Sequence, residues 1–348
     1  MISGVVKKLQ EKSSLSHDEI TGAMSEILSG KSTEQENYDF LSSLTEKGET
    51  DEELLGMLEK MNEFSLKITP ENEGRIIDVC GTGGDKLQTF NISTTASFVI
   101  AASGGIVAKH GNRSNSGIFG SADIFEYFGY DLMQEPDSIK KILKKFNICF
   151  MFAQKFHPAM KHLASARKKF QKRTAFNILG PLTNPAGVKN QLIGVSTEDL
   201  LERLPKILQK NGAEYIMTVK SENGMDEFST SANNKVCFLK NDKILTNIVN
   251  PEMVGLHKSS IKDIQINTKE EAIKSFVDVL NGTANQAMIE TTALNAAGGL
   301  IVNGITNSFD EGVELALSSI NDGKAFKLFT EFIKNAGDES KINEVLES

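Results

Sequence analysis

The sequence predicts an α/β protein: a small N-terminal helical domain, then a larger α/β domain with a mostly parallel central sheet, and a cleft between them. Two patterns predict this fold. The first seventy residues repeat a helix-start signal followed by apolar residues at helical spacing, and from residue 75 short apolar runs alternate with longer amphipathic segments. The length of 348 residues suits about two domains, since a domain holds roughly 100–200 residues.

Capping boxes mark the helices of the first domain. A serine or threonine stands three residues before a glutamate in the pairs Ser16 and Glu19, Thr33 and Glu36, and Thr50 and Glu53. Each hydroxyl can accept a hydrogen bond from an unpaired amide of the first turn, and the apolar residues behind it form one buried stripe. We therefore expect three or more short helices packed together, with residues 1–72 as the helical domain.

After this domain, strands and helices alternate along the chain. We expect strands at residues 75–80, 105–108, 148–152, 191–195 and 215–219, helices at 94–103, 121–128, 138–147 and 197–211, and a β-ribbon at 236–248 that turns at Asn241 and Asp242. The last hundred residues are mainly helical. Residues 164–185 interrupt the alternation, and there we expect the chain to revisit the helical domain, over about 167–190. The α/β domain then comprises residues 73–166 and 191–348.

Composition excludes several classes of protein. No apolar run reaches the roughly 18 residues that a membrane span needs, and the N-terminus lacks the apolar block of a secretory signal. The formal net charge of −8 argues against nonspecific nucleic-acid binding. The cysteines Cys80, Cys149 and Cys237 are scattered, which favours neither a disulfide framework nor a zinc site. We expect a cytoplasmic protein.

A glycine-rich turn follows the first predicted strand. Residues 81–85 read GTGGD, and three glycines in this turn let backbone amides approach an anion without obstruction by Cβ atoms. Residues 89–95 then open a helix, whose N-terminus attracts negative charge. Taken alone, the turn is explained equally well as a capped strand-to-helix connection. It lacks the sequence of a Walker loop and the spacing of a dinucleotide fingerprint.

Two further polar loops follow predicted strands. Residues 109–114 read KHGNRS, and residues 120–123, GSAD, start the next helix. Asp226 and Glu227 are adjacent acids in a glycine-containing loop. Adjacent carboxylates are usually only solvated, but beside a polyphosphate they would be natural Mg²⁺ ligands. Because ligands of open α/β sheets bind beyond the carboxyl ends of the strands, we expect these loops to share one edge of the sheet.

Together, these motifs resemble the anthranilate phosphoribosyltransferase family. The resemblance is carried by GTGGD at 81–85, TFNIST at 89–94, KHGNRS at 109–114, GSAD at 120–123, HPAMKHLASAR at 157–167, RTAFNILGPLTNPA at 173–186 and MDE at 225–227. Their order and spacing hold over roughly residues 16–300, which is far more specific than any single motif. The resemblance implies a hinge between the two domains and a homodimer formed through the helical domain.

The resemblance also implies the site residues and the cofactor. Phosphoribosyl pyrophosphate (PRPP) would be bound by Gly81, Gly83, Gly84, Asp85, Thr89, Asn91, Ser93, Thr94, Lys109 and Ser121. Mg²⁺ would be held by Ser93, Asp226 and Glu227, and anthranilate would be lined by Gly81, His110, Asn112, His157, Arg167 and Pro181. Lys109, Asp226 and Glu227 would be the catalytic residues. Physical chemistry agrees for Arg167, because a guanidinium can pair with the carboxylate of anthranilate in two-pronged geometry.

The implied reaction is attack of the anthranilate amine on C1 of the ribose, with loss of pyrophosphate, in tryptophan biosynthesis. The transition state would be positive at the sugar and increasingly negative at the leaving group, so electrostatic stabilisation and exclusion of water suffice without a strong base. The chain departs from the family pattern at Gly117, where a second serine is usual, and at Ile289 and Glu290, where an Arg-Asp pair is typical.

Two alternatives stay open at this stage. A pyrimidine nucleoside phosphorylase has the same architecture, but its loops differ from GTGGD and KHGN, and it would not need Arg167 to meet a carboxylate. A non-catalytic relative that binds nucleic acid would need a basic face, for which residues 161–172 are the only candidate in the sequence.

Overall fold

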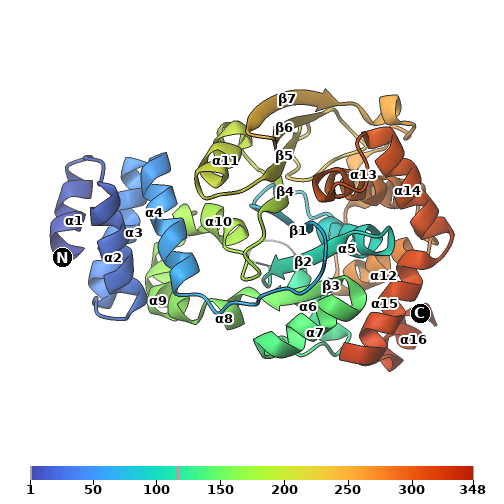
Figure 1. Ribbon diagram of the computed structural model, residues 1–348, viewed down its shortest axis with the longest axis horizontal. Coiled ribbons are helices and arrows are strands. Elements are labelled where there is room, and N and C mark those ends of the chain that lie inside the picture. The colour runs from blue at the N-terminus through green and yellow to red at the C-terminus, as the bar shows by residue number, and fades with distance from the viewer. Residues whose placement is uncertain (1, 115–117, 348) are drawn as a thin grey trace.

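A helical bundle forms one end of the molecule. The computed structural model describes residues 2–114 and 118–347. The bundle contains α1 (Ile2–Gln10), α2 (His17–Leu28), α3 (Glu34–Lys47), α4 (Asp51–Glu63), α9 (Lys161–Phe170) and α10 (Ala175–Leu179). Figure 1 shows α9 and α10, in green, against the blue N-terminal helices. The contacts of α9 with α2 and α3, and of α10 with α4, bring the middle of the chain back to its start.

A single sheet forms the centre of the described chain. Its strands are β1 (Ile76–Gly81), β2 (Ile106–Gly111), β3 (Ile148–Phe152), β4 (Asn190–Gly194), β5 (Tyr215–Ser221), β6 (Asn234–Lys240) and β7 (Lys243–Val249). Their order across the sheet is β3-β2-β1-β4-β5-β6-β7. The strands from β3 to β5 are parallel, and β6 and β7 add an antiparallel ribbon. The sheet is therefore mostly parallel, as the sequence predicted.

Helices cover both faces of this sheet (Figure 1). Those of the α/β part are α5 (Ile92–Ala102), α6 (Ser121–Tyr127), α7 (Pro136–Phe146), α8 (Ala153–Phe156), α11 (Glu198–Lys210), α12 (Lys269–Leu280), α13 (Gln286–Asn303), α14 (Phe309–Asn321), α15 (Lys324–Ala336) and α16 (Ser340–Leu346). Short 3₁₀ turns occur at η1 (Pro158–Met160), η2 (Gly180–Leu182), η3 (Pro251–Val254) and η4 (Ile261–Ile264). The described residues contain no helix that is both long and apolar enough to cross a membrane.

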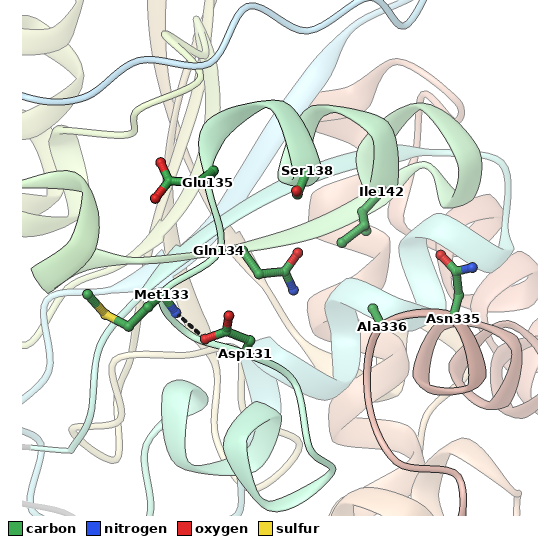
Figure 2. Close-up of a pocket in the computed structure, with 8 residues that line it drawn as sticks. All are labelled: Asp131, Met133, Gln134, Glu135, Ser138, Ile142, Asn335 and Ala336. Carbon is green, nitrogen blue, oxygen red and sulfur yellow. Dashed lines mark hydrogen bonds between the residues drawn. The ribbon is translucent and has the colours of Figure 1, made fainter.

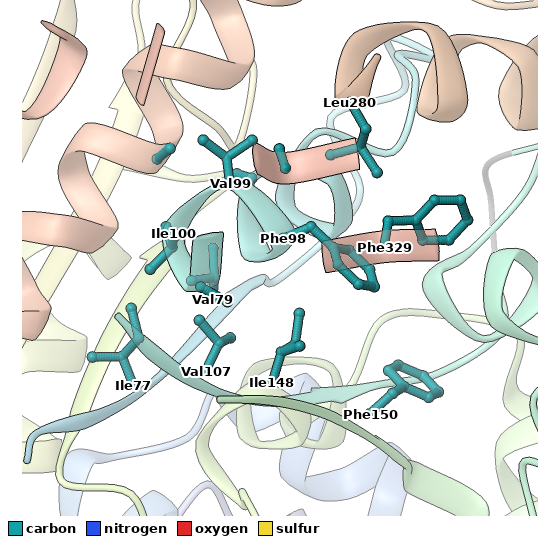
Figure 3. Close-up of a cluster of buried hydrophobic side chains, with 14 of the residues drawn as sticks. Ile77, Val79, Phe98, Val99, Ile100, Val107, Ile148, Phe150, Leu280 and Phe329 are labelled. Carbon is teal, nitrogen blue, oxygen red and sulfur yellow. The ribbon is translucent and has the colours of Figure 1, made fainter. Parts of the chain in front are cut away.

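The alternation of side chains along the strands divides the core. Leu192 packs into a large apolar cluster with α5, α13 and α15, whereas its neighbour Ile193 packs into a second cluster with α11 and the bundle. Figure 3 shows the first cluster, where Phe98 of α5 and Phe329 of α15 lie above strand residues such as Val107. Successive strand residues point to opposite faces, so each apolar strand can serve both clusters. This rigid centre fixes the positions of the loops at the strand ends.

Most predicted elements are confirmed within a few residues of their bounds. The capping boxes at Ser16, Thr33 and Thr50 are all formed. Asn241 and Asp242 turn between β6 and β7 with φ of 50° and 60°, the left-handed backbone that a tight hairpin needs. Sequence reasoning missed α1, which has no acidic residue in its first turn to mark its start.

Candidate active site

The carboxyl edge of the parallel strands gathers the polar loops. β1 ends at Gly81, β2 at Gly111, β3 at Phe152 and β5 at Ser221. Because these strands run in the same direction, the GTGGD turn, the loop after His110, the segment with His157 and the loop with Asp226 all leave the sheet at this edge. The sequence indicated this convergence, and the topology accounts for it.

Buried carboxylates form an acidic cluster at this edge. Asp226 shares a hydrogen bond with Asp85, and burial together with the charge of Asp85 raises the pKa of Asp226 to about 7. Burial, followed by the charge of Asp226, raises the pKa of Glu227 well above its usual value. Both acids hold their protons far more tightly than in water, so a positive ligand at this place would relieve an unfavourable concentration of charge.

Lys109 supplies the buried positive charge beside this cluster. Only 2% of its surface is exposed, and its Nζ donates to the backbone oxygen of Val79 at 2.6 Å and to Oγ of Ser93 at 3.3 Å. Ser93 also hydrogen-bonds Glu227 and so connects the cation with the acid. Burial lowers the pKa of Lys109, while the nearby Asp78 carboxylate opposes that shift.

Asp78 is a site residue that sequence reasoning missed. It is fully buried in β1, accepts a hydrogen bond from the backbone N–H of His110 at 3.1 Å, and accepts another from Nδ2 of Asn184 at 2.8 Å. Burial raises its pKa to about 6, against the opposing effect of Lys109. A lone acid inside an apolar strand was the signal in the sequence, since an acid is seldom fully buried without a partner.

Two glycines make room for the acidic loop. A Cβ atom on Gly81 would lie 3.1 Å from Oδ2 of Asp226, and one on Gly194 would overlap the backbone oxygen of Asp226. Gly194, at the end of β4, was also absent from the predicted site. Asp226 therefore takes its position because β1 and β4 both end in residues without side chains.

The helix that follows the glycine-rich turn begins among the expected PRPP ligands. Asn91 precedes α5 and donates from Nδ2 to the backbone oxygen of Phe119 at 2.9 Å, while its Oδ1 is buried with no partner among the described residues. Thr94 is 1% exposed. Thr89 forms an isolated antiparallel bridge with Gln265. The bridge at Thr89 therefore holds the end of the turn next to α5, and Oδ1 of Asn91 remains available as an acceptor.

The loop after β2 holds Asn112 and Ser121 together. Oγ of Ser121 donates to the backbone oxygen of Asn112 at 3.3 Å. Arg113 forms ion pairs with Asp123 and Glu126 on α6, which close this loop onto the helix. Gly117, the departure from the family pattern, lies outside the described residues. Glu290, the other departure from the family pattern, has a hydrogen-bond partner in the structure: its carboxylate accepts from the backbone N–H of His257 at 2.8 Å.

Arg167 is half-buried on α9. Burial lowers its pKa, and it lies over the ring of Phe176 with 5.8 Å between the guanidinium carbon and the ring centre. No acidic side chain within residues 2–114 and 118–347 forms an ion pair with it. Partial burial removes water from this charge without giving it an ionic partner, so the position is suited to an anionic ligand.

Two histidines lie close together near the same edge. The ring centres of His110 and His157 are 5.2 Å apart. Burial lowers the pKa of His157 to about 4 and that of His110 well below its usual value, so both rings are neutral at pH 7. His157 contacts the backbone oxygen of Thr183 through Nε2 at 3.0 Å, whereas Nε2 of His110 has no partner in the part of the chain described. Pro181 precedes Thr183 by two residues, and its backbone oxygen accepts a hydrogen bond from Nε2 of Gln191 at 2.8 Å.

The oxygen donors of the acidic cluster fit a magnesium ion. Mg²⁺ usually takes one or two carboxylates and completes its shell with substrate phosphates and water. Asp226 and Glu227 provide carboxylates beside the hydroxyl of Ser93, and their raised pKa values mark the uncompensated charge that a divalent cation would neutralise. The described residues contain no group of three or more His, Cys, Asp or Glu side chains arranged to hold a metal. A magnesium ion there would complete its shell with phosphate oxygens and water.

A surface pocket is lined by a different set of residues. It has a volume of about 610 Å³ and is lined by Asp131, Met133, Gln134, Glu135, Ser138, Ile142, Asn335 and Ala336. Figure 2 shows that it lies between α7 with the segment before it and the end of α15. None of the site residues predicted from the sequence lines it.

Comparison with known families accounts for nearly the whole chain. Residues 3–65 match the helical bundle domain of a glycosyl transferase family, and residues 73–326 match the α/β domain of the same family. The anthranilate phosphoribosyltransferase of Nitrosopumilus maritimus is 69% identical over 345 residues, which cover 99% of both chains. That of Cenarchaeum symbiosum is 49% identical and covers 98% of this chain and 99% of its own.

Solved structures show the same fold. The crystal structure of anthranilate phosphoribosyltransferase from Thermus thermophilus superposes with a TM-score of 0.88 at 32% identity, covering 94% of this chain and 98% of its own. The enzyme from Saccharomyces cerevisiae in complex with PRPP and Mg superposes with a TM-score of 0.85 at 24% identity, over 99% of this chain and 98% of its own. At that lower identity the likeness concerns the fold.

Proposed function

The chain belongs to the anthranilate phosphoribosyltransferase family, and we propose that the carboxyl edge of its sheet is where the phosphoribosyl group passes from PRPP to anthranilate. The reaction joins the amine of anthranilate to C1 of the ribose and releases pyrophosphate. Two features at this edge carry the assignment: an acidic cluster suited to a metal diphosphate, and the half-buried Arg167, which has no ionic partner among the described residues and is suited to a carboxylate.

The diphosphate side of the proposed site is made of the glycine-rich turn and its surroundings. Gly81, Gly83, Gly84, Asp85, Thr89, Asn91, Ser93, Thr94, Lys109 and Ser121 would contact PRPP. Amides at the N-terminus of α5 face negative charge favourably because of the helix dipole. The ammonium of Lys109, held 2.6 Å from the Val79 carbonyl, is fixed in place before the substrate arrives, so little reorganisation is needed when charge develops on the leaving group.

Ser93, Asp226 and Glu227 would hold Mg²⁺, which would supply positive charge to the leaving pyrophosphate. The chain's own contribution is to keep these oxygens buried and aligned. Burial raises the pKa of both acids, so loss of their protons is coupled to binding of positive charge.

The acceptor side of the proposed site orients anthranilate. Arg167 would pair with its carboxylate, with Gly81, Asn112 and Pro181 lining the space around the ring. His110 and His157 are neutral, which suits hydrogen bonding and ring contact rather than proton transfer. No strong base is required for the attack, because the amine of anthranilate already presents a lone pair, and the proton that the nitrogen loses once the C1–N bond has formed passes to pyrophosphate or water. Orientation of the amine toward C1 and exclusion of water are the remaining tasks.

The domain and assembly expectations are part of the same proposal. Residues 1–72 with a returning segment at about 167–190 would move against residues 73–166 and 191–348, two copies would associate through the helical bundle, and the protein would work in the cytoplasm. Light scattering after size-exclusion chromatography checks the assembly: a mass of twice 38.0 kDa is expected, and a mass of 38.0 kDa at micromolar concentration would contradict it.

Loss of anthranilate fluorescence tests the activity itself. The signal should fall only when the protein, PRPP and Mg²⁺ are all present, and pyrophosphate should appear in equal amount. Phosphorolysis of uridine by inorganic phosphate, without use of anthranilate, would instead support the nucleoside phosphorylase alternative. Retention of DNA on a filter at moderate salt, with no turnover of either substrate, would support the nucleic-acid-binding alternative.

A further inference from the structure

Arg173, which is not among the site residues assigned above, forms hydrogen bonds with the glycine-rich turn. It lies between α9 and α10, in the segment that joins these two helices of the bundle. Its Nη1 donates to the backbone oxygen of Gly83 at 2.7 Å, and its Nη2 donates to the backbone oxygen of Thr82 at 3.1 Å. One guanidinium therefore holds two consecutive carbonyls of a turn that is 90 residues away in the sequence.

The turn is shaped to receive this guanidinium. Gly83 and Gly84 have φ of +66° and +96°, a backbone conformation that side chains disfavour. A Cβ atom on Gly84 would overlap Nη1 of Arg173, so the absence of a side chain is what lets the guanidinium approach.

The hydrogen bonds from Arg173 to two carbonyls determine where the N–H groups of the turn point. In a trans peptide unit the C=O and the N–H lie in one plane and point in opposite directions. When Arg173 holds the carbonyls of Thr82 and Gly83, the N–H groups of Gly83 and Gly84 must face away from it. The N–H of Gly83 donates to the carboxylate of Asp226, so this amide faces the acidic cluster where the diphosphate is proposed to bind. The N–H of Gly84 points away from Arg173 for the same geometric reason.

We propose that Arg173 is a positioning residue: it sets the amides of Gly83 and Gly84 toward the diphosphate of PRPP before the substrate binds. This inference rests on the proposed function. Arg173 acts through the turn, so its effect belongs to the affinity for PRPP and not to the handling of anthranilate. A lysine could not replace it, because one ammonium lacks the planar fork that spans two carbonyls.

Steady-state kinetics of Arg173→Ala test the proposal. KM for PRPP should rise about tenfold or more, as expected when two charge-assisted hydrogen bonds no longer order the turn. The turnover number and KM for anthranilate should stay within about threefold of the wild type. Arg203→Ala is the matched control, because Arg203 also donates to a backbone carbonyl, that of Glu49, and to Asp51, away from this edge. An unchanged KM for PRPP in Arg173→Ala would overturn the proposal.

A double-mutant cycle with Gly84→Ala separates positioning from direct contact with the diphosphate. If Arg173 works through the turn, Gly84→Ala should raise KM for PRPP strongly in the wild type and several-fold less in the Arg173→Ala background, where the overlap is gone. Equal effects in both backgrounds would contradict the positioning role. A wild-type chain that turns over no anthranilate would instead refute the proposed function, so the two failures are distinguishable.

Discussion

The backbone oxygen of Asp226 occupies the space that a Cβ atom would fill on Gly194. The residue whose carboxylate is proposed to hold Mg²⁺ is therefore placed by the end of a strand that contributes no side chain of its own to the site. Gly81 makes a second, looser approach to the same acid, with a Cβ position 3.1 Å from Oδ2.

Gly194→Ala should push Asp226 out of place. We expect a loss of about 1–3 kcal/mol in the free energy of unfolding, since the added methyl has no space, and a fall in turnover of at least about tenfold. Urea unfolding and the fluorescence assay measure the two effects. Gly4→Ala in α1 is the control, because no atom lies within 4 Å of its Cβ position. Wild-type behaviour of Gly194→Ala would contradict this account of how Asp226 is placed.

Affinity for Mg²⁺ should fall as the pH falls through 7. The pKa of Asp226 is raised to about 7, so below that pH the metal must displace a proton. We expect the Mg²⁺ concentration for half-maximal activity to rise at least about tenfold for each pH unit below 7, and more steeply where Glu227 must also release a proton. Titrations of activity with Mg²⁺ at saturating PRPP, at several values between about pH 5.5 and 8, measure this concentration. Folded proteins are most stable between about pH 5 and 8, so unfolding does not interfere. A half-maximal concentration independent of pH would show that Asp226 is not a metal ligand.

Asp226→Asn should stabilise the metal-free protein while it abolishes turnover. An acid whose pKa is raised in the folded state contributes to the free energy of unfolding. Its contribution is complete at low pH and is lost as the pH rises through the pKa of the folded state. For Asp226 the loss runs from about 4, its unfolded value, to about 7. At about pH 8 we expect Tm of Asp226→Asn to exceed that of the wild type by a few degrees, with no excess at about pH 4.

The same comparison has an internal control. Adding Mg²⁺ and PRPP should raise Tm of the wild type at about pH 8 but not that of Asp226→Asn, because only the wild type retains both carboxylates. The double variant Asp226→Asn with Glu227→Gln should lose turnover at any Mg²⁺ concentration. Near-normal kinetics of that double variant would refute the assignment of both acids.

Arg167→Ala should chiefly weaken the use of anthranilate. Loss of a half-buried guanidinium that pairs with a carboxylate in two-pronged geometry removes roughly 2–4 kcal/mol of binding, which corresponds to a rise in KM for anthranilate of about thirtyfold to a thousandfold. Lys168→Ala, an exposed neighbour on α9, should leave KM unchanged. If KM for PRPP rose and that for anthranilate did not, Arg167 would belong to the other substrate.

Asp78→Asn should move the alkaline limb of the pH–rate profile to lower pH. Burial lowers the pKa of Lys109, and the charge of Asp78 opposes this, so its removal lowers that pKa further. We expect the limb to lie at lower pH in Asp78→Asn than in the wild type, because the attraction that held the proton on Lys109 is lost. Lys109→Met should remove the limb together with most of the activity. An unmoved limb in Asp78→Asn would show that another group titrates there.

Much of the fold was predictable because its signals are local. The capping boxes of the bundle and the turn at Asn241 and Asp242 follow from the chemistry of a few adjacent residues. The convergence of GTGGD, His110 and Asp226 was predictable for a topological reason, since parallel strands end at one edge.

The remaining determinants depend on contacts between distant segments. Nothing next to Gly194 in the sequence indicates that Asp226 crosses it, and nothing near Arg173 indicates that it reaches Gly83. Asp78 looked like a member of an apolar strand, and only the packing of β1 against His110 and Asn184 reveals its role as a buried acceptor. Such pairings arise from tertiary packing, for which a single sequence carries no periodic signal.

A crystal structure of the protein with PRPP and Mg²⁺ tests the central claim most directly. The account predicts the diphosphate at hydrogen-bonding distance from the amides of Gly83 and Gly84, beside Asn91, with the metal on Asp226 and Glu227. A diphosphate bound away from the carboxyl edge of the sheet, with the GTGGD turn unoccupied, would contradict it.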